Sequence, residues 1–211
     1  PAYGQDRTTL PIAEPAFDGR MAETSVDAKP ATSQPVRAPQ GAPNIFLFMS
    51  DDVGFSMSGT FGGPVPTPNF DRMAAQGQRY NRFHTAGICS PSRASLLTGR
   101  NTHNVATGYL TDLSANYPGY SARIPASTNP IAATLRMNGY STAMFGKHHN
   151  VPHGENSPAG PFDHWPTGKW GFEHFFGLIG GDTNQWHPAL YRGTNRLPDR
   201  EGKPQLLDKS L

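Results

Sequence analysis

The chain has 211 residues, which is enough for one domain with a buried core, and its 23 glycines and 21 prolines predict a loop-rich one. A net charge of +2 carried by scattered lysines and arginines excludes the clustered basic surface of a nucleic-acid binder. No apolar run approaches the roughly 18 residues that cross a membrane, and the single cysteine, Cys89, excludes an internal disulfide.

Residues 1–43 are rich in proline and have no sustained apolar period. This composition predicts an extended N-terminal arm, with the folded part in residues 44–211. The chain begins at Pro1 with neither an initiator methionine nor an apolar signal core, so we expect that a signal peptide has been removed or that the start is missing.

The first predicted element is a strand at residues 44–50, a continuous apolar run that suits a strand buried on both faces of a parallel sheet. A helix is predicted from Thr67-Pro68 to Gly77, with Phe70, Met73 and Ala74 on one face. Residues 78–85 are predicted to form a second strand that leads to Cys89.

A short helix is predicted directly after Cys89, with Ser90 as its N-cap, Pro91 at its first position and Gly99 at its end. Cys89 would then lie near the positive end of the helix dipole, with Arg93 about one turn further along. Such a position suits an anion or an oxygen nucleophile.

A third helix is predicted to begin at Asn129-Pro130 and to end at Gly139, with Ile131 and Leu135 facing inward. Residues 140–145 are predicted to follow as a third strand. Residues 108–125 read as a loop, and no regular element is predicted for residues 151–186.

Strands that alternate with helices predict an α/β fold with a mostly parallel sheet and helices on both faces. In such sheets functional groups gather beyond the carboxyl ends of the strands. Four polar residues directly follow predicted strands: Asp51, Asp52, Cys89 and Lys147.

Asp51 and Asp52 are hard ligands of the kind that Ca²⁺ or Mg²⁺ prefers. Neighbouring side chains on a strand point to opposite faces, so both can bind one ion only if the chain turns, which Gly54 would allow. The alternative is a solvated turn.

Lys147 and His149 are two residues apart at a strand exit and can share one face. A cation beside an imidazole suits a tetrahedral dianion. A solvated loop with a surface lysine is the alternative.

The sequence Cys89-Ser90-Pro91-Ser92-Arg93, followed by Leu97-Thr98-Gly99-Arg100, resembles the signature of the type I sulfatases. The resemblance to bacterial arylsulfatases extends from Pro43 to about Arg192 and includes the segments 51–55, 146–149 and 180–186. It implies a fold like that of alkaline phosphatase and the sulfatases.

The resemblance also implies a chemistry. In that family the cysteine is oxidised to Cα-formylglycine by a maturating enzyme, which would make Cys89 the nucleophile. Asp51, Asp52 and the modified Cys89 would hold Ca²⁺ rather than Mg²⁺. Lys147 and His149 would contact the sulfate, and we expect Arg93 to stabilise its charge.

The implied substrate is a small-molecule sulfate ester, and the family implies a periplasmic or secreted protein. The family completes its cation site with a later Asp-Asn pair that has no match here, and Asp182-Thr183-Asn184 is not assigned to metal. Family members run several times longer, so we expect residues 44–211 to be the N-terminal part of a catalytic domain truncated at its C-terminus.

Two other functions stay open at this point. A phosphonate or phosphate ester hydrolase of the same superfamily shares the metal and nucleophile chemistry. A truncated module without catalytic activity is the other alternative.

Overall fold

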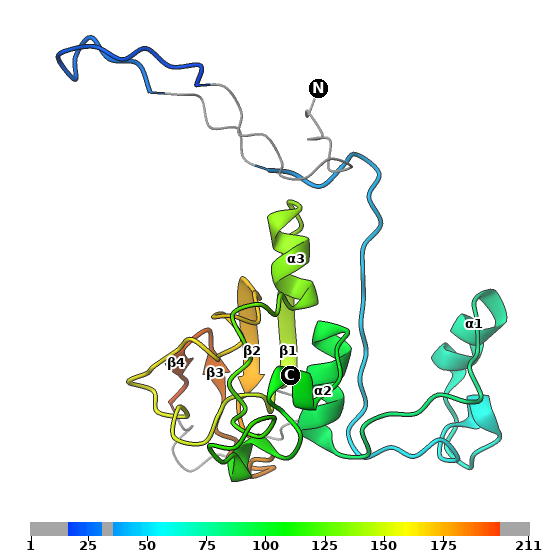
Figure 1. Cartoon of the computed structure of the whole chain (residues 1–211). Helices are drawn as coiled ribbons and strands as arrows, with labels where there is room; N and C mark the ends of the chain where they lie inside the picture. The colour runs from blue at the N-terminus through cyan, green and yellow to red at the C-terminus, as the bar shows by residue number, and fades with distance from the viewer. Residues whose placement is uncertain (1–16, 31–35, 199–211) are drawn as a thin grey trace.

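The computed structural model describes residues 17–30 and 36–198 (Figure 1). Its helices are α1 (Pro68–Gln76), α2 (Cys89–Thr98) and α3 (Ile131–Met137), with short 3₁₀ turns η1 (Gly59–Phe61), η2 (His103–Val105) and η3 (Thr111–Leu113). Its strands are β1 (Ala143–Lys147), β2 (His174–Leu178), β3 (Tyr191–Arg192) and β4 (Asn195–Arg196). Across these described ranges, no helix has the length and apolar character that a membrane crossing requires.

The four strands form one sheet in the order β1-β2-β3-β4. Strands β1 and β2 are parallel over five residues, from Ala143 opposite His174 to Lys147 opposite Leu178. Strands β3 and β4 form a short antiparallel hairpin on β2. The predicted α/β class is therefore confirmed, with parallel pairing in the long strands and antiparallel pairing at one edge.

Gly146 and Gly177 face each other in the β1–β2 register, one step before Lys147. A Cβ atom at Gly177 would collide with the backbone of Gly146. The two strands can therefore approach at this level only because Gly177 carries no side chain.

Two buried clusters form the core. One surrounds Trp170 and takes Ala94 and Leu97 from α2 and Ala132 from α3. The other surrounds Trp165 and takes Phe175 from β2. Met144 of β1 packs against both clusters, so its side chain joins the strand that leads to Lys147 to both parts of the core.

Helix α2 begins at Cys89, two residues before the predicted first position Pro91, with Ile88 in the N-cap position. The predicted Ser90 cap is wrong: Ser90 is fully buried, and its Oγ lies 3.4 Å from the hydroxyl of Thr111. The predicted end is confirmed, because Gly99 adopts a left-handed conformation and donates its N–H to the carbonyl of Ser95.

The predicted strand at residues 44–50 is wrong. The segment makes no strand pairing, and Phe46 is 85% exposed. It forms one wall of a 790 Å³ cavity, with β1 and residues from α2 and α3 as other walls. An apolar run becomes a strand only with a hydrogen-bonded neighbour, and among the described residues this run has none.

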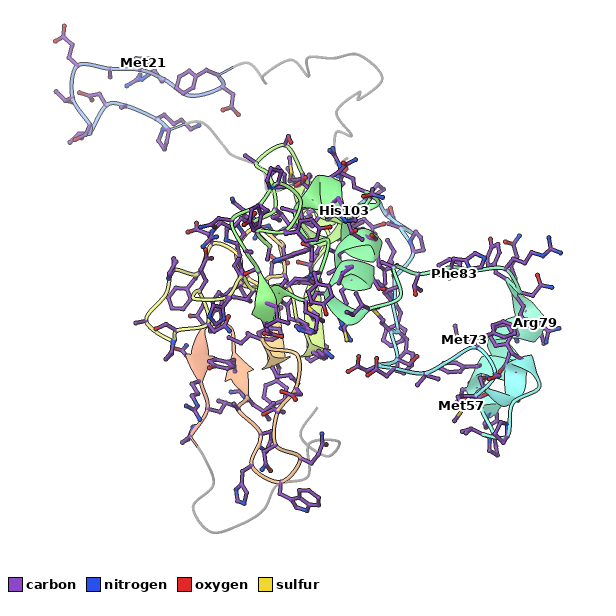
Figure 2. The ribbon with its side chains drawn as sticks, turned by 60° about the horizontal axis from the view of Figure 1, so that its bottom comes forward. Met21, Met57, Met73, Arg79, Phe83 and His103 are labelled. Carbon is purple, nitrogen blue, oxygen red and sulfur yellow. The ribbon has the colours of Figure 1, made fainter. Side chains whose placement is uncertain are left out.

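Residues 78–85 are also exposed and make no strand pairing, so the second predicted strand is wrong. They follow η1 and α1, whose contacts include Thr60 donating to Asp71 at 2.6 Å. Figure 2 shows Met57, Met73 and Arg79 together around η1 and α1, apart from the sheet. Helix α1 was predicted correctly, but none of its residues is buried.

The third predicted helix and strand are confirmed with shifted details. In α3 the buried residue is Ala132, while Ile131, predicted to face inward, is 42% exposed. The strand predicted at residues 140–145 occurs at Ala143–Lys147. Strand β2 lies in the region for which no element was predicted, where glycines at positions 177, 180 and 181 interrupt the apolar pattern.

Candidate active site

Three potential cation ligands converge where the chain enters α2 and leaves the extended segment 44–50. One ligand atom from each of Asp51, Asp52 and Cys89 lies within 4.8 Å of the others. Asp52 has a left-handed backbone conformation with φ 54°, so the turn expected at Gly54 occurs at Asp52 itself. The two adjacent carboxylates can therefore approach the same point.

Two cationic side chains contact Asp51. The Nζ atom of Lys147 lies 2.9 Å from its Oδ2, and Nη2 of Arg93 lies 3.6 Å from its Oδ1. Burial raises the pKa of Asp51, but the hydrogen bond and charge of Lys147 and the charge of Arg93 outweigh it and hold the pKa below its usual value. Asp51 is therefore an anion at neutral pH.

Arg93 joins α2 to the end of β1. Its Nη1 donates to the carbonyl of Lys147 at 2.6 Å, and the residue is only 6% exposed. One guanidinium thus contacts the strand exit and the Asp51 carboxylate together. This fixes the distance between Cys89, four residues before Arg93 in the chain, and Lys147.

His149 lies at the same exit but has a different partner. Its Nε2 atom is 2.5 Å from Oδ2 of Asp112 in η3, and its side chain is 3% exposed. Burial lowers the pKa of His149, Asp112 raises it, and Lys147 and Arg93 lower it further, so that the net shift is downward. The imidazole is therefore neutral at neutral pH.

The backbone around His149 is tied to the start of α2. The Thr111 hydroxyl donates to the carbonyl of His149 at 3.1 Å, and the side-chain Nδ2 of Asn150 donates to the carbonyl of Ser90 at 3.0 Å. His149 itself has a φ of 57°, which turns the chain as it leaves β1. The position of the imidazole relative to α2 is therefore fixed by hydrogen bonds.

His148, which lies between Lys147 and His149 in the chain, points into the core. It is fully buried, and its ring meets Trp170 edge-on at a centroid distance of 5.2 Å. Burial, with smaller effects of Arg93 and His149, lowers its pKa to about 3. His148 therefore packs in the core, whereas Lys147 contacts Asp51 and His149 contacts Asp112.

The structure brings together five of the predicted site residues: Asp51, Asp52, Cys89, Arg93 and Lys147. The sixth, His149, leaves the same strand but turns to Asp112. Sequence analysis missed Asp112, because it lies in the region treated as a loop and no spacing marks it. The side-chain oxygen of Asn184 accepts hydrogen bonds from the backbone N–H groups of residues 186 and 187.

Comparisons with known proteins identify the family to which this chain is similar. The sulfatase family model matches residues 43–211. The arylsulfatase of Klebsiella aerogenes is 34% identical over 159 residues, covering 74% of this chain and 32% of that protein. Arylsulfatase G of Mus musculus is 37% identical over 145 residues, covering 67% of this chain and 24% of that protein.

A solved structure shows the same fold. The crystal structure of Ps i-CgsB aligns with a TM-score of 0.58 and 23% identity, over 75% of this chain and 37% of that one. The chain thus spans about a quarter to a third of the length of the two curated relatives described.

Proposed function

Because this chain belongs to the sulfatase family, we propose that the protein hydrolyses sulfate esters with a formylglycine made from Cys89. The observation that carries the proposal is the convergence of Cys89 with Asp51 and Asp52 within 4.8 Å, beside the charges of Arg93 and Lys147. A sulfate ester is a tetrahedral anion, and the two cationic side chains offer the charge it needs.

The proposal requires a maturating enzyme that converts the Cys89 side chain from a thiol to an aldehyde. Cys89 is partly exposed at the first position of α2. A hydrated aldehyde has two hydroxyl groups on one carbon. One can attack sulfur, and the other can then re-form the aldehyde and release the bound sulfate. Neither a serine nor an unmodified cysteine has this second hydroxyl.

The donor set fits a hard cation of the Ca²⁺ type. Asp51 and Asp52 supply carboxylate oxygens, whereas the sulfur of an unmodified Cys89 is too soft for this ion. A hydroxyl on the modified residue would place a third oxygen at the same point. A bound cation would supply positive charge that favours the deprotonated form of this hydroxyl.

The remaining steps use side chains of this chain. The deprotonated hydroxyl oxygen attacks sulfur, and the bond from sulfur to the ester oxygen breaks. The ester oxygen leaves with the electron pair of that bond and takes a proton from water to give the alcohol. Arg93 and Lys147 stabilise the charge on the sulfate oxygens. His149 then takes the proton of the second hydroxyl, the bond from carbon to the sulfate oxygen breaks, and the aldehyde re-forms as sulfate leaves.

Mass spectrometry tests the first requirement. The tryptic peptide 83–93, which begins after Arg82 and ends at Arg93, contains Cys89. In protein produced with a maturating enzyme we expect this peptide to show the mass loss of the thiol-to-aldehyde conversion. An unmodified thiol in a protein that still hydrolyses sulfate esters would contradict the proposed nucleophile.

Matched substrates test the reaction class. The protein from its complete reading frame should hydrolyse an aryl sulfate faster than the aryl phosphonate with the same leaving group. A preference for the phosphonate would support the related ester hydrolase instead. Absence of turnover of either substrate by fully modified protein would contradict both.

A further inference from the structure

The contact between His149 and Asp112 leaves one ring nitrogen of the histidine free. Nε2 faces the Asp112 carboxylate at 2.5 Å, whereas Nδ1 is buried and has no hydrogen-bond partner among the described residues. A neutral imidazole has one N–H and one lone pair. A carboxylate accepts hydrogen bonds, so the N–H belongs on Nε2 and the lone pair on Nδ1.

The third residue of this group is Gly181. A Cβ atom built on it would lie 2.7 Å from Nε2 of His149 and 3.0 Å from Oδ2 of Asp112. The backbone of Gly181 therefore lies directly against the hydrogen bond between the two side chains. At its neighbour Gly180 a Cβ atom would make only an ordinary van der Waals contact, 3.8 Å from the backbone oxygen of Asp182.

The charges around His149 show why a carboxylate is needed. Lys147 and Arg93 both act against a protonated imidazole, as does burial of the ring. Asp112 is the group that acts in the opposite direction. Without it, a proton accepted by Nδ1 would produce a cation beside two others.

Resting on the function proposed above, we propose that Asp112 is a positioning residue that holds the His149 proton on Nε2 and keeps Nδ1 free as the proton acceptor for the formylglycine hydroxyl. In that step the hydroxyl proton moves to Nδ1, and the oxygen electron pair forms the aldehyde as sulfate leaves. The proton on Nε2 stays between His149 and Asp112. Gly181 keeps the space that this contact occupies.

The tautomer can be measured without substrate. In the protein from its complete reading frame, labelled with ¹⁵N-histidine, His149 is assigned by comparison with His149→Gln. We expect an unprotonated Nδ1 and a protonated Nε2. In Asp112→Asn we expect the proton to move to Nδ1 or to exchange between the two nitrogens. A wild-type proton on Nδ1, or an unchanged tautomer in the variant, would overturn the inference.

The pH profile gives a second readout. Asp112 raises the pKa of His149, so Asp112→Asn lowers it and should move the acid limb of kcat/KM for an aryl sulfate to lower pH. We also expect the plateau to fall by about 10²-fold, the contribution typical of a positioned base. A loss of activity with an unmoved acid limb would assign Asp112 a purely structural role. The exposed Asp163→Asn is the matched charge control.

A glycine pair provides an independent test in which His149 and Asp112 are not themselves substituted. Gly181→Ala should displace the His149–Asp112 contact and lower kcat/KM, whereas Gly180→Ala should leave it near the wild-type value. Equal effects of the two variants would count against the arrangement. If the wild-type protein has no sulfatase activity, the tautomer measurement still tests the pair, so failure of the proposed function and failure of this inference are distinguishable.

Discussion

Lys147 donates from Nζ to both carboxylate oxygens of Asp51, at 2.9 and 3.2 Å, across 96 positions of sequence. Because the Asp51 side chain is half exposed, we do not expect this ion pair to contribute much to folding stability. Its importance is electrostatic: the anion and the cation that the proposed reaction needs lie next to each other.

The Asp51 carboxylate should be required for cation binding. We expect Asp51→Asn to weaken Ca²⁺ affinity by at least about tenfold, because one charged oxygen ligand is lost and neutral amide oxygens bind hard cations less strongly. Isothermal titration of the chelator-treated protein measures this. Asp27→Asn, which removes a carboxylate from an exposed turn in residues 17–30, should have no effect. Equal affinities in the two variants would contradict the assigned site.

The Lys147 charge should matter in the transition state. Lys147→Met keeps most of the side-chain volume but removes the charge, and we expect kcat for an aryl sulfate to fall by about 10²–10³-fold. Steady-state kinetics at saturating substrate measure the change. Lys29→Met, in the N-terminal region, removes the same charge at an exposed residue and should keep wild-type kcat. A change in KM alone would show that Lys147 only binds substrate.

Cys89, as the precursor of the aldehyde, should be essential for turnover and dispensable for folding. Cys89→Ala should abolish sulfate ester hydrolysis, because alanine cannot be oxidised to the aldehyde. Alanine is the best helix former, and Cys89 is partly exposed in α2, so we expect the free energy of unfolding to stay within about 0.5 kcal/mol. Retained turnover would overturn the assignment of the nucleophile, and urea unfolding provides the stability measurement.

His148 should make the fold sensitive to acid. Its pKa is about 3 in the folded protein, whereas the ordinary histidine value is 6.5. Above pH 6.5 the His148 ring is neutral in both the folded and the unfolded protein, so it does not lower the free energy of unfolding. Between 6.5 and 3 only the unfolded state takes up this proton, so the free energy of unfolding should fall with decreasing pH by up to about 1.4 kcal/mol per unit.

The variant His148→Phe isolates this effect, because phenylalanine can keep the edge-on contact with Trp170 but cannot titrate. Urea unfolding monitored by tryptophan fluorescence, at about pH 4.5 and pH 7.5, should show a smaller pH dependence in this variant than in the wild type. The exposed His187→Phe is the control and should retain the wild-type dependence. An identical pH dependence in all three proteins would show that His148 is not buried as a neutral ring.

Local chemistry allowed the helices to be predicted better than the strands. Pro68, Gly77 and Gly99 mark helix ends by their own backbone preferences, and α1 and α2 end where these residues predict. The run 44–50 has the apolar character of a strand, but pairing depends on a neighbour that the local sequence does not reveal. Strand β2 was missed for the opposite reason, since Gly177 interrupts its pattern while β1 supplies the neighbour.

The same distinction applies to the site. Cys89, Arg93 and Lys147 lie in motifs that could be recognised, and the structure brings them close to Asp51. Asp112 could not be found in this way, because its importance arises only when η3 packs against the turn at His149. Tertiary contact, rather than a motif, identifies such a residue.

Gly177, which faces Gly146 in the sheet, restricts how this protein can vary. A side chain at position 177 would push β2 away from β1, and the next residue of β1 in the register is Lys147. A mutation in the middle of a strand, without any contact to substrate, would thereby displace an amine that the proposed reaction needs. In a saturation library screened for turnover, we would therefore find position 177 as intolerant as the nucleophile, although its role is only to leave room.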